Sequence, residues 1–254
     1  MTVELYWYVD TILLEMLSSD LQVGWYSAGY KLFEALLIFP MIICQAVSPQ
    51  LSRLFVSDKA EHRNLMRRIF KFAFIISVVV IGCGLIIADD LIVFLYGANY
   101  QPAAAGLRIL LIGFIFSFLH FVLHAVLISI DQQSALARMS SIGLLFNIIA
   151  NLLLIPRYGL IGAAAATVAS ECLIFVLGYN FLKRTNGEIG LISLIWRPVL
   201  AGLLLGASVS IFTWQPELWH FILIIPAYFA VLILLRTFDD VEIRRFRHLL
   251  GFRS

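Results

Sequence analysis

The sequence predicts an all-α integral membrane protein with about eight transmembrane helices. Of its 254 residues, 61% are hydrophobic and only 13% are charged, whereas a soluble domain has about 45–50% apolar and about 25% charged residues. Long apolar runs recur along the chain, and most approach the roughly 20 residues that a helix needs to cross a bilayer. Because no polar face recurs within these runs at helical spacing, they do not fit amphipathic helices of a soluble protein.

The expected spans are separated by short connections. They cover residues 2–17, 23–51, 70–88, 103–130, 137–155, 160–182, 194–213 and 219–235. The first is short and carries acidic residues, so we expect an upstream segment to be missing. Between the second and third spans, Arg53 to Lys71 is expected to form an amphipathic helix on the membrane surface. Asp89-Asp90 is expected to begin a separate segment that ends in a turn at Gly97 and Asn99.

The basic residues predict the orientation of the spans. Of the 18 Lys and Arg residues, those in the connections after even-numbered spans and in the tail are Arg53, Lys59, Arg63, Arg67, Arg68, Lys71, Arg138, Lys183, Arg184, Arg236, Arg244, Arg245, Arg247 and Arg253. Cytoplasmic connections carry the excess of Lys and Arg, so these segments and the C-terminus are expected in the cytoplasm, in contact with anionic lipids. Several aromatic residues, Tyr26 among them, are expected at the outer membrane interface.

Residues 147–171 are expected to form a transmembrane hairpin around Pro156 and Gly159, with its turn outside the cell. Gly162 and the four alanines that follow it, 163–166, are small residues of the kind that lets membrane helices pack closely. We interpret them as packing material and not as a ligand site.

Polar residues of the same hairpin are expected to pair between helices. Glu171 lies within the second apolar run, and Asn147 and Asn151 lie on the first. The three side chains are expected to form one interhelical hydrogen-bond set, which structure alone can explain.

Charged side chains within the first two spans are candidates for a substrate path, because a charge in mid-membrane costs roughly 2.5–3.5 kcal/mol on insertion scales. Lys31 and Glu34 are three residues apart and share a helix face. They are either a cavity-lining pair for a charged substrate or coupling ion, or an internal salt bridge that makes the span insertable. Asp10 is expected to line a polar cavity, facing Lys31 from the adjacent helix.

His120 and His124 are four residues apart, a spacing also seen for two zinc ligands on one helix. A zinc site needs at least a third ligand, and no HExxH motif or cysteine cluster accompanies them. We expect the two histidines to face a cavity or to bond a neighbouring span, where they can carry protons.

Other chemistry has no support in the sequence. Cys44, Cys83 and Cys172 all fall in apolar runs, which is typical of buried thiols and not of a disulfide framework. No catalytic Ser/His/Asp grouping, nucleotide-binding loop or nucleic-acid signature is visible. We therefore expect no enzyme activity, no cofactor, no metal and no nucleic-acid partner.

Several spaced motifs resemble one family of transporters. Asn151 to Thr167 matches the pattern N-x-x-L-I-P-x-x-G-x-x-G-A-A-x-A-T of the polysaccharide flippases, which belong to the multidrug/oligosaccharidyl-lipid/polysaccharide exporter superfamily. Three more stretches fit the family in the same order: Val9-Asp10 with its apolar run, Val23 to Ala28 with Pro40 and Ser48 to Ser52, and Leu95 to Tyr100 with Ala103 and Leu107. The resemblance covers about residues 1–185.

The resemblance implies a fold of two six-helix lobes followed by two further helices. Residues 1–185 are then the second lobe, 186–236 the two extra helices and 237–254 a basic cytoplasmic tail, while a first lobe is missing or separately encoded. Family members move lipid-linked oligosaccharides across the cell inner (cytoplasmic) membrane for surface polysaccharide synthesis, O-antigen and lipopolysaccharide included. Two alternatives remain: a cation-coupled multidrug exporter of the same superfamily, and a membrane-embedded acyltransferase that uses His120 or His124.

Overall fold

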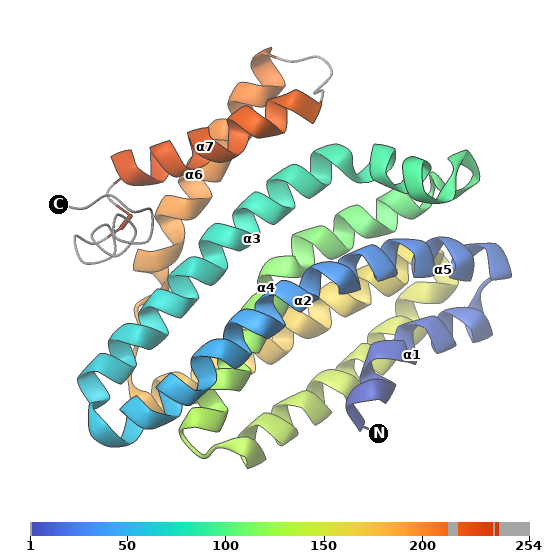
Figure 1. The fold of residues 1–254 in the computed structure, drawn as a ribbon. Helices are drawn as coiled ribbons and strands as arrows, with labels where there is room; N and C mark the ends of the chain where they lie inside the picture. The colour runs from blue at the N-terminus through green and yellow to red at the C-terminus, as the bar shows by residue number, and fades with distance from the viewer. Residues whose placement is uncertain (1, 213–217, 236, 239–254) are drawn as a thin grey trace. The chain divides into compact units, whose positions relative to one another are not determined.

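The computed structural model describes residues 2–212, 218–235 and 237–238, and every regular element within these ranges is a helix. The predicted all-α class is therefore confirmed (Figure 1). The elements are α1 (Thr2–Leu17), α2 (Asp20–Ser57), α3 (Lys59–Tyr96), the 3-10 helix η1 (Ala98–Tyr100), α4 (Ala103–Ser129), α5 (Gln133–Asn186), α6 (Leu191–Phe212) and α7 (Leu218–Leu234).

Four of these helices, α2 to α5, are long and apolar enough to cross a membrane. The count of eight spans stays a prediction. The expected turn at Trp214 to Glu217 and all but the first two residues of the expected tail lie outside the described residues.

The chain divides into two compact units, Met1–Ile189 and Gly190–Ser254. In the first unit, α4 packs against α2, α3 and α5 and forms the centre of the core. In the second, α6 packs against α7, and the Tyr228 hydroxyl donates to the carbonyl of Pro198 at 3.4 Å. The assignment of these units to a second lobe and two extra helices stays a prediction.

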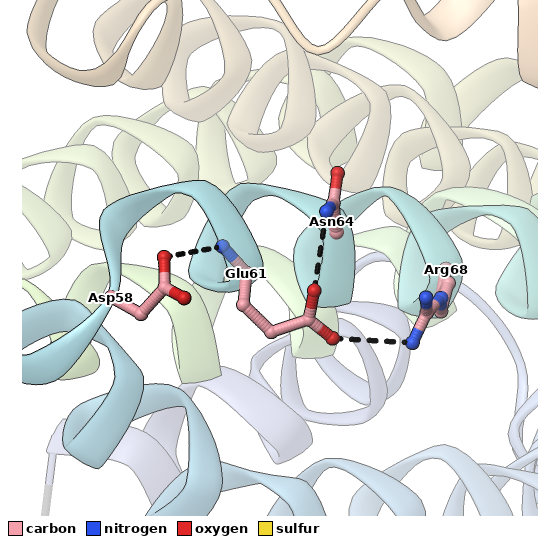
Figure 2. Close-up of polar contacts among 4 residues, drawn as sticks. All are labelled: Asp58, Glu61, Asn64 and Arg68. Carbon is pink, nitrogen blue, oxygen red and sulfur yellow. Dashed lines mark hydrogen bonds and ion pairs between the residues drawn. The ribbon is translucent and has the colours of Figure 1, made fainter.

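A single residue, Asp58, makes the corner between α2 and α3. Its backbone N–H bonds the carbonyl of Leu54 and ends α2, while its carboxylate accepts from the backbone N–H groups of Ala60 and Glu61 at 2.9 and 3.0 Å. A carboxylate in this position caps the positive end of the new helix. Figure 2 shows that Glu61 then bonds Asn64 and Arg68, at 3.2 and 3.4 Å, along the first turns of α3.

The observed bounds of α2 and α3 show that two predictions about the connections were wrong. Arg53 to Lys71 is not one helix on the membrane surface but the polar ends of two 38-residue helices. Such helices are about 57 Å long at 1.5 Å per residue, so they extend beyond the hydrocarbon of about 30 Å. Asp89-Asp90 likewise begins no new segment, because α3 continues to Tyr96 and ends at Gly97, whose φ is +86°.

The expected hairpin of residues 147–171 is present within α5, which folds back on itself (Figure 1). Close contacts pair residues on either side of Gly159. A Cβ built on Gly162 would lie 2.5 Å from the carbonyl oxygen of Leu154, and one on Gly143 would lie 2.3 Å from Ile174. The Leu154 oxygen belongs to the backbone, so the approach at Gly162 requires glycine, and the halves 133–158 and 160–186 pack closely at both positions.

Gly159 makes the reversal possible. Its φ of +54° and ψ of −129° are non-helical and fall where residues with a Cβ are strained. The break frees the backbone N–H of Leu160, which donates to the side-chain oxygen of Gln22 on α2 at 2.8 Å. A Cβ at position 159 would lie 1.6 Å from that same oxygen, so the turn and its bond to α2 both require glycine.

Gly159→Ala is expected to destabilise the protein by at least about 1 kcal/mol, because a Cβ is strained at positive φ and displaces the Gln22 side chain. Thermal unfolding of the purified protein in detergent measures the loss. Gly82→Ala is the matched control, since a Cβ there meets nothing within 4 Å. Equal unfolding temperatures for the two variants would contradict this account of the turn.

Candidate functional site

A buried carboxylate, that of Asp10 on α1, lies at the centre of the candidate site. Asp10 is only 3% exposed. Oδ2 accepts from the Thr167 hydroxyl at 2.6 Å and from the Tyr26 hydroxyl at 3.2 Å, and Oδ1 accepts from Nδ2 of Asn151 at 2.6 Å. The two bonds of 2.6 Å are short, as is typical of an ionised acceptor. The three donors come from α2 and both halves of α5.

Around this carboxylate, oxygen atoms outnumber the hydrogens that can bond them. Nδ2 of Asn151 has two hydrogens but three acceptors, because the backbone and side-chain oxygens of Asn147 also lie at 3.0 Å. Among the described residues, the buried side-chain oxygen of Asn151 has no hydrogen-bond partner. The arrangement therefore gathers negative potential in one place and can take up a single positive charge, a proton or a small cation.

The structure adds partners that the sequence did not indicate. Tyr26 is 1% exposed and bonds Asp10 and Thr167, while its expected place at the outer membrane interface stays a prediction. Asn151 donates to Asp10 and to Asn147, and Glu171 meets His120 of α4, so the interhelical set of Asn147, Asn151 and Glu171 stays a prediction.

A second polar contact joins α4 to the second half of α5. Nδ1 of His120 lies 2.9 Å from Oε2 of Glu171, with side chains 21% and 11% exposed. His124, one turn further along α4, is exposed. The structure therefore brings His120 to a neighbouring helix but does not engage His124 in the same bond.

Lys31 and Glu34 are exposed side chains on α2. No ion pair between them is seen in the described part of the chain, so they are not the internal salt bridge that the sequence allows. Nor does the structure bring Lys31 to Asp10, which is buried among other partners. Exposed apolar side chains, Ile38, Phe39 and Ile42, follow Glu34 along the same helix.

Of the hairpin residues, Gly159 and Gly162 are buried and Pro156 is exposed. Sequence reasoning missed Thr167, although the run of small residues that precedes it signals close packing. It also missed the ion pair between Asp89 on α3 and Arg108 on α4, which a continuous α3 makes possible. Groups of three or more His, Cys, Asp or Glu residues that suit a metal are absent from the described residues.

The chain has detectable relatives. A family model described as MatE matches residues 1–153. The probable flippase AglR of Haloferax volcanii is 25% identical over 216 residues, which cover 83% of this chain and 45% of that protein. The capsular polysaccharide biosynthesis protein CapF of Staphylococcus aureus is 27% identical over 177 residues, which cover 69% and 45%.

Solved structures share the fold. The lipid II flippase MurJ in an inward closed conformation has a TM-score of 0.72 at 14% identity, over 98% of this chain and 52% of that one. A MATE protein in a bent conformation has a TM-score of 0.68 at 21% identity, over 83% and 50%. The chain spans about half the length of the relatives and structures that it matches.

Thr167→Val is expected to destabilise the protein by about 1–3 kcal/mol, because the buried carboxylate of Asp10 loses one of its three donors. Thr167→Ser keeps the hydroxyl and is expected to retain most of the stability. Denaturant or thermal unfolding in detergent compares them.

Thr185→Val is the control for this change, since Thr185 is exposed and bonds only the carbonyls of its own helix. If Thr185→Val lost as much stability as Thr167→Val, the bond from Thr167 to Asp10 would not be the cause of the destabilisation.

Proposed function

The chain belongs to the MatE family, and on this premise we propose that it is the C-terminal half of a flippase for lipid-linked oligosaccharides. The proposal rests above all on the relatives that match most of the chain, whose names refer to a flippase and to capsular polysaccharide biosynthesis. The fold is that of membrane transporters, and the chain is a multi-pass membrane protein. It is proposed to act in surface polysaccharide synthesis, and to carry out transport and not an enzymatic reaction.

The exposed face of α2 suits an amphipathic substrate. Lys31 and Glu34 are exposed on a membrane helix, where a charge is costly unless it meets water or a partner. The ammonium of Lys31 can bind the phosphates of a lipid-linked sugar, and Glu34 can accept bonds from sugar hydroxyls. The exposed Ile38, Phe39 and Ile42 can contact its hydrocarbon chain.

Asp10 is proposed as the group that carries the coupling charge. A buried carboxylate held by α1, α2 and α5 changes its interaction with all three helices when a proton or a small cation binds. Alternating access in transporters moves one bundle of helices relative to another. A change of charge at Asp10 can therefore alter how α1, α2 and α5 pack.

The orientation and further partners are part of the same proposal. The polar corner at Asp58 and the start and end of α5 are assigned to the cytoplasmic side of the inner membrane, on the basis of their Lys and Arg residues. The C-terminus is then cytoplasmic, and the basic side chains contact anionic lipids. The other half of the transporter is a first lobe, in the same polypeptide or in another one.

Deletion of the gene that encodes this chain is expected to leave lipid-linked oligosaccharide in the inner leaflet and to remove the surface glycan. The measurement is the fraction of lipid-linked sugar that a membrane-impermeant periodate reagent oxidises in intact cells. Restoring the gene with Lys31→Ala and Glu34→Ala together is expected to recover less than about a tenth of the accessible fraction, since two charged contacts are worth over 1.4 kcal/mol.

Lys59→Ala is the matched control, because Lys59 is an exposed cation at the start of α3 and is expected to restore full function. Unchanged periodate accessibility in the deletion strain would refute the proposal. Increased sensitivity to cationic dyes instead would favour a multidrug exporter, and loss of acyl groups from an otherwise normal glycan would favour an acyltransferase.

A further inference from the structure

One face of α2 carries an exposed stripe that continues well beyond Lys31 and Glu34. The exposed side chains that define this stripe are Lys31, Glu34, Ile38, Ile42, Gln45 and Ser52. Because successive helical residues are about 100° apart, these positions lie within about 40° of one line along the helix. From residue 31 to residue 52 the line is about 32 Å long, which matches the roughly 30 Å of hydrocarbon in a bilayer.

Gln45 places a polar amide in the inner half of this stripe. It is exposed and lies about 10 Å from the midpoint of α2, which covers Asp20–Ser57. If α2 is centred in the bilayer, Gln45 is within the hydrocarbon region, which reaches about 15 Å to either side of the midplane. An amide at this depth is costly against lipid, so its position favours contact with water or a polar ligand.

Pro49 adds a second polar group at the same place. Proline has no N–H, so the backbone carbonyl of Gln45 lacks the donor that a helix normally supplies four residues further on. Pro49 lies inside α2 and is itself exposed. The side-chain amide and the backbone carbonyl of Gln45 are therefore both placed to bond a ligand on the exposed stripe.

The chemistry of these groups suits a neutral, hydroxyl-rich ligand. An amide offers two N–H donors and one acceptor oxygen, and the carbonyl offers a second acceptor. Hydroxyl groups of a sugar both donate and accept, so they can bond all of these atoms. Phosphate binds most strongly to cationic donors, and a calcium ion takes six to eight oxygen ligands, so neither is matched by Gln45.

We propose that Gln45 is a sugar-binding residue of the substrate path, on the side of Lys31 and Glu34 that faces the Asp58 corner. This inference rests on the proposed function, since the oligosaccharide is the ligand that brings sugar hydroxyls to this face. Gln45 lies about 16 Å along the helix from Glu34, and the apolar Ile38 and Ile42 separate them. The glycan therefore reaches Gln45 and the charged pair at successive stages of its passage.

The first test is photo-cross-linking in cells that build the glycan from a radioactive sugar. The photoreactive amino acid benzoylphenylalanine replaces Ile38, Gln45 or Gln50 in turn, and the label on the protein is measured after irradiation. Positions 38 and 45 are expected to acquire label. Gln50 is the matched control, because it is exposed on the same helix but about 140° around it from Gln45, and it is expected to acquire less than about a tenth as much.

The second test measures transport in the deletion strain restored with variants. Gln45→Leu keeps the size of the side chain but removes the amide. It is expected to slow the appearance of periodate-accessible lipid-linked sugar by about tenfold, as for the loss of one or two hydrogen bonds between neutral groups. Gln45→Asn keeps an amide and is expected to stay closer to the wild-type rate, and Gln50→Leu is expected to match it. Immunoblots confirm equal amounts of each variant in the membrane.

The possible failures are distinguishable. Label at position 38 without label at position 45, or a wild-type rate in Gln45→Leu, overturns the assignment of Gln45 alone. Label at neither position overturns the whole exposed stripe as a substrate path, the assignment of Gln45 included. If the wild-type gene restores no periodate-accessible sugar to the deletion strain, the proposed function fails, and the role of Gln45 fails with it.

Discussion

The buried carboxylate of Asp10 is the constraint on which the packing of α1, α2 and α5 depends. Removing an ion from water costs several kcal/mol even after relaxation, whereas single hydrogen bonds in membrane proteins average well under 2 kcal/mol. One donor is therefore not enough, and the carboxylate is stable only where Tyr26, Asn151 and Thr167 converge on it. Separating any of these helices would expose the charge.

The convergence of the donors follows from the geometry of the α5 hairpin. Asn151 precedes Gly159 by eight residues and Thr167 follows it by eight, so the reversal places both at the same level. The reversal itself depends on a backbone conformation open to glycine and on the bond from Leu160 to Gln22 of α2. The same α2 carries Tyr26, so one pair of helices sets both the turn and the site.

Periodicity and composition predict the helical class and the hairpin, because both depend on local properties such as apolar length and the turn-forming Gly159. They do not predict partners across helices. Asp10 was expected to face Lys31, yet it meets Thr167, a residue 157 positions away in the chain. The prediction of one surface helix over 53–71 was wrong for another reason. Alternating polar and apolar residues fit a surface helix, but they also fit the ends of two long helices that continue past the membrane. The cap at Asp58, which ends α2 and begins α3, shows that the second arrangement is present.

The second half of α5 links the two polar centres mechanically. Thr167 and Glu171 are four residues apart on it, about one turn, and they bond α1 and α4 respectively. A helix moves nearly as a rigid body over one turn, because its backbone bonds resist local stretching. A displacement of α5 that lengthens the bond from Thr167 to Asp10 must therefore also change the distance from Glu171 to His120. The two polar centres therefore share one structural element, the second half of α5.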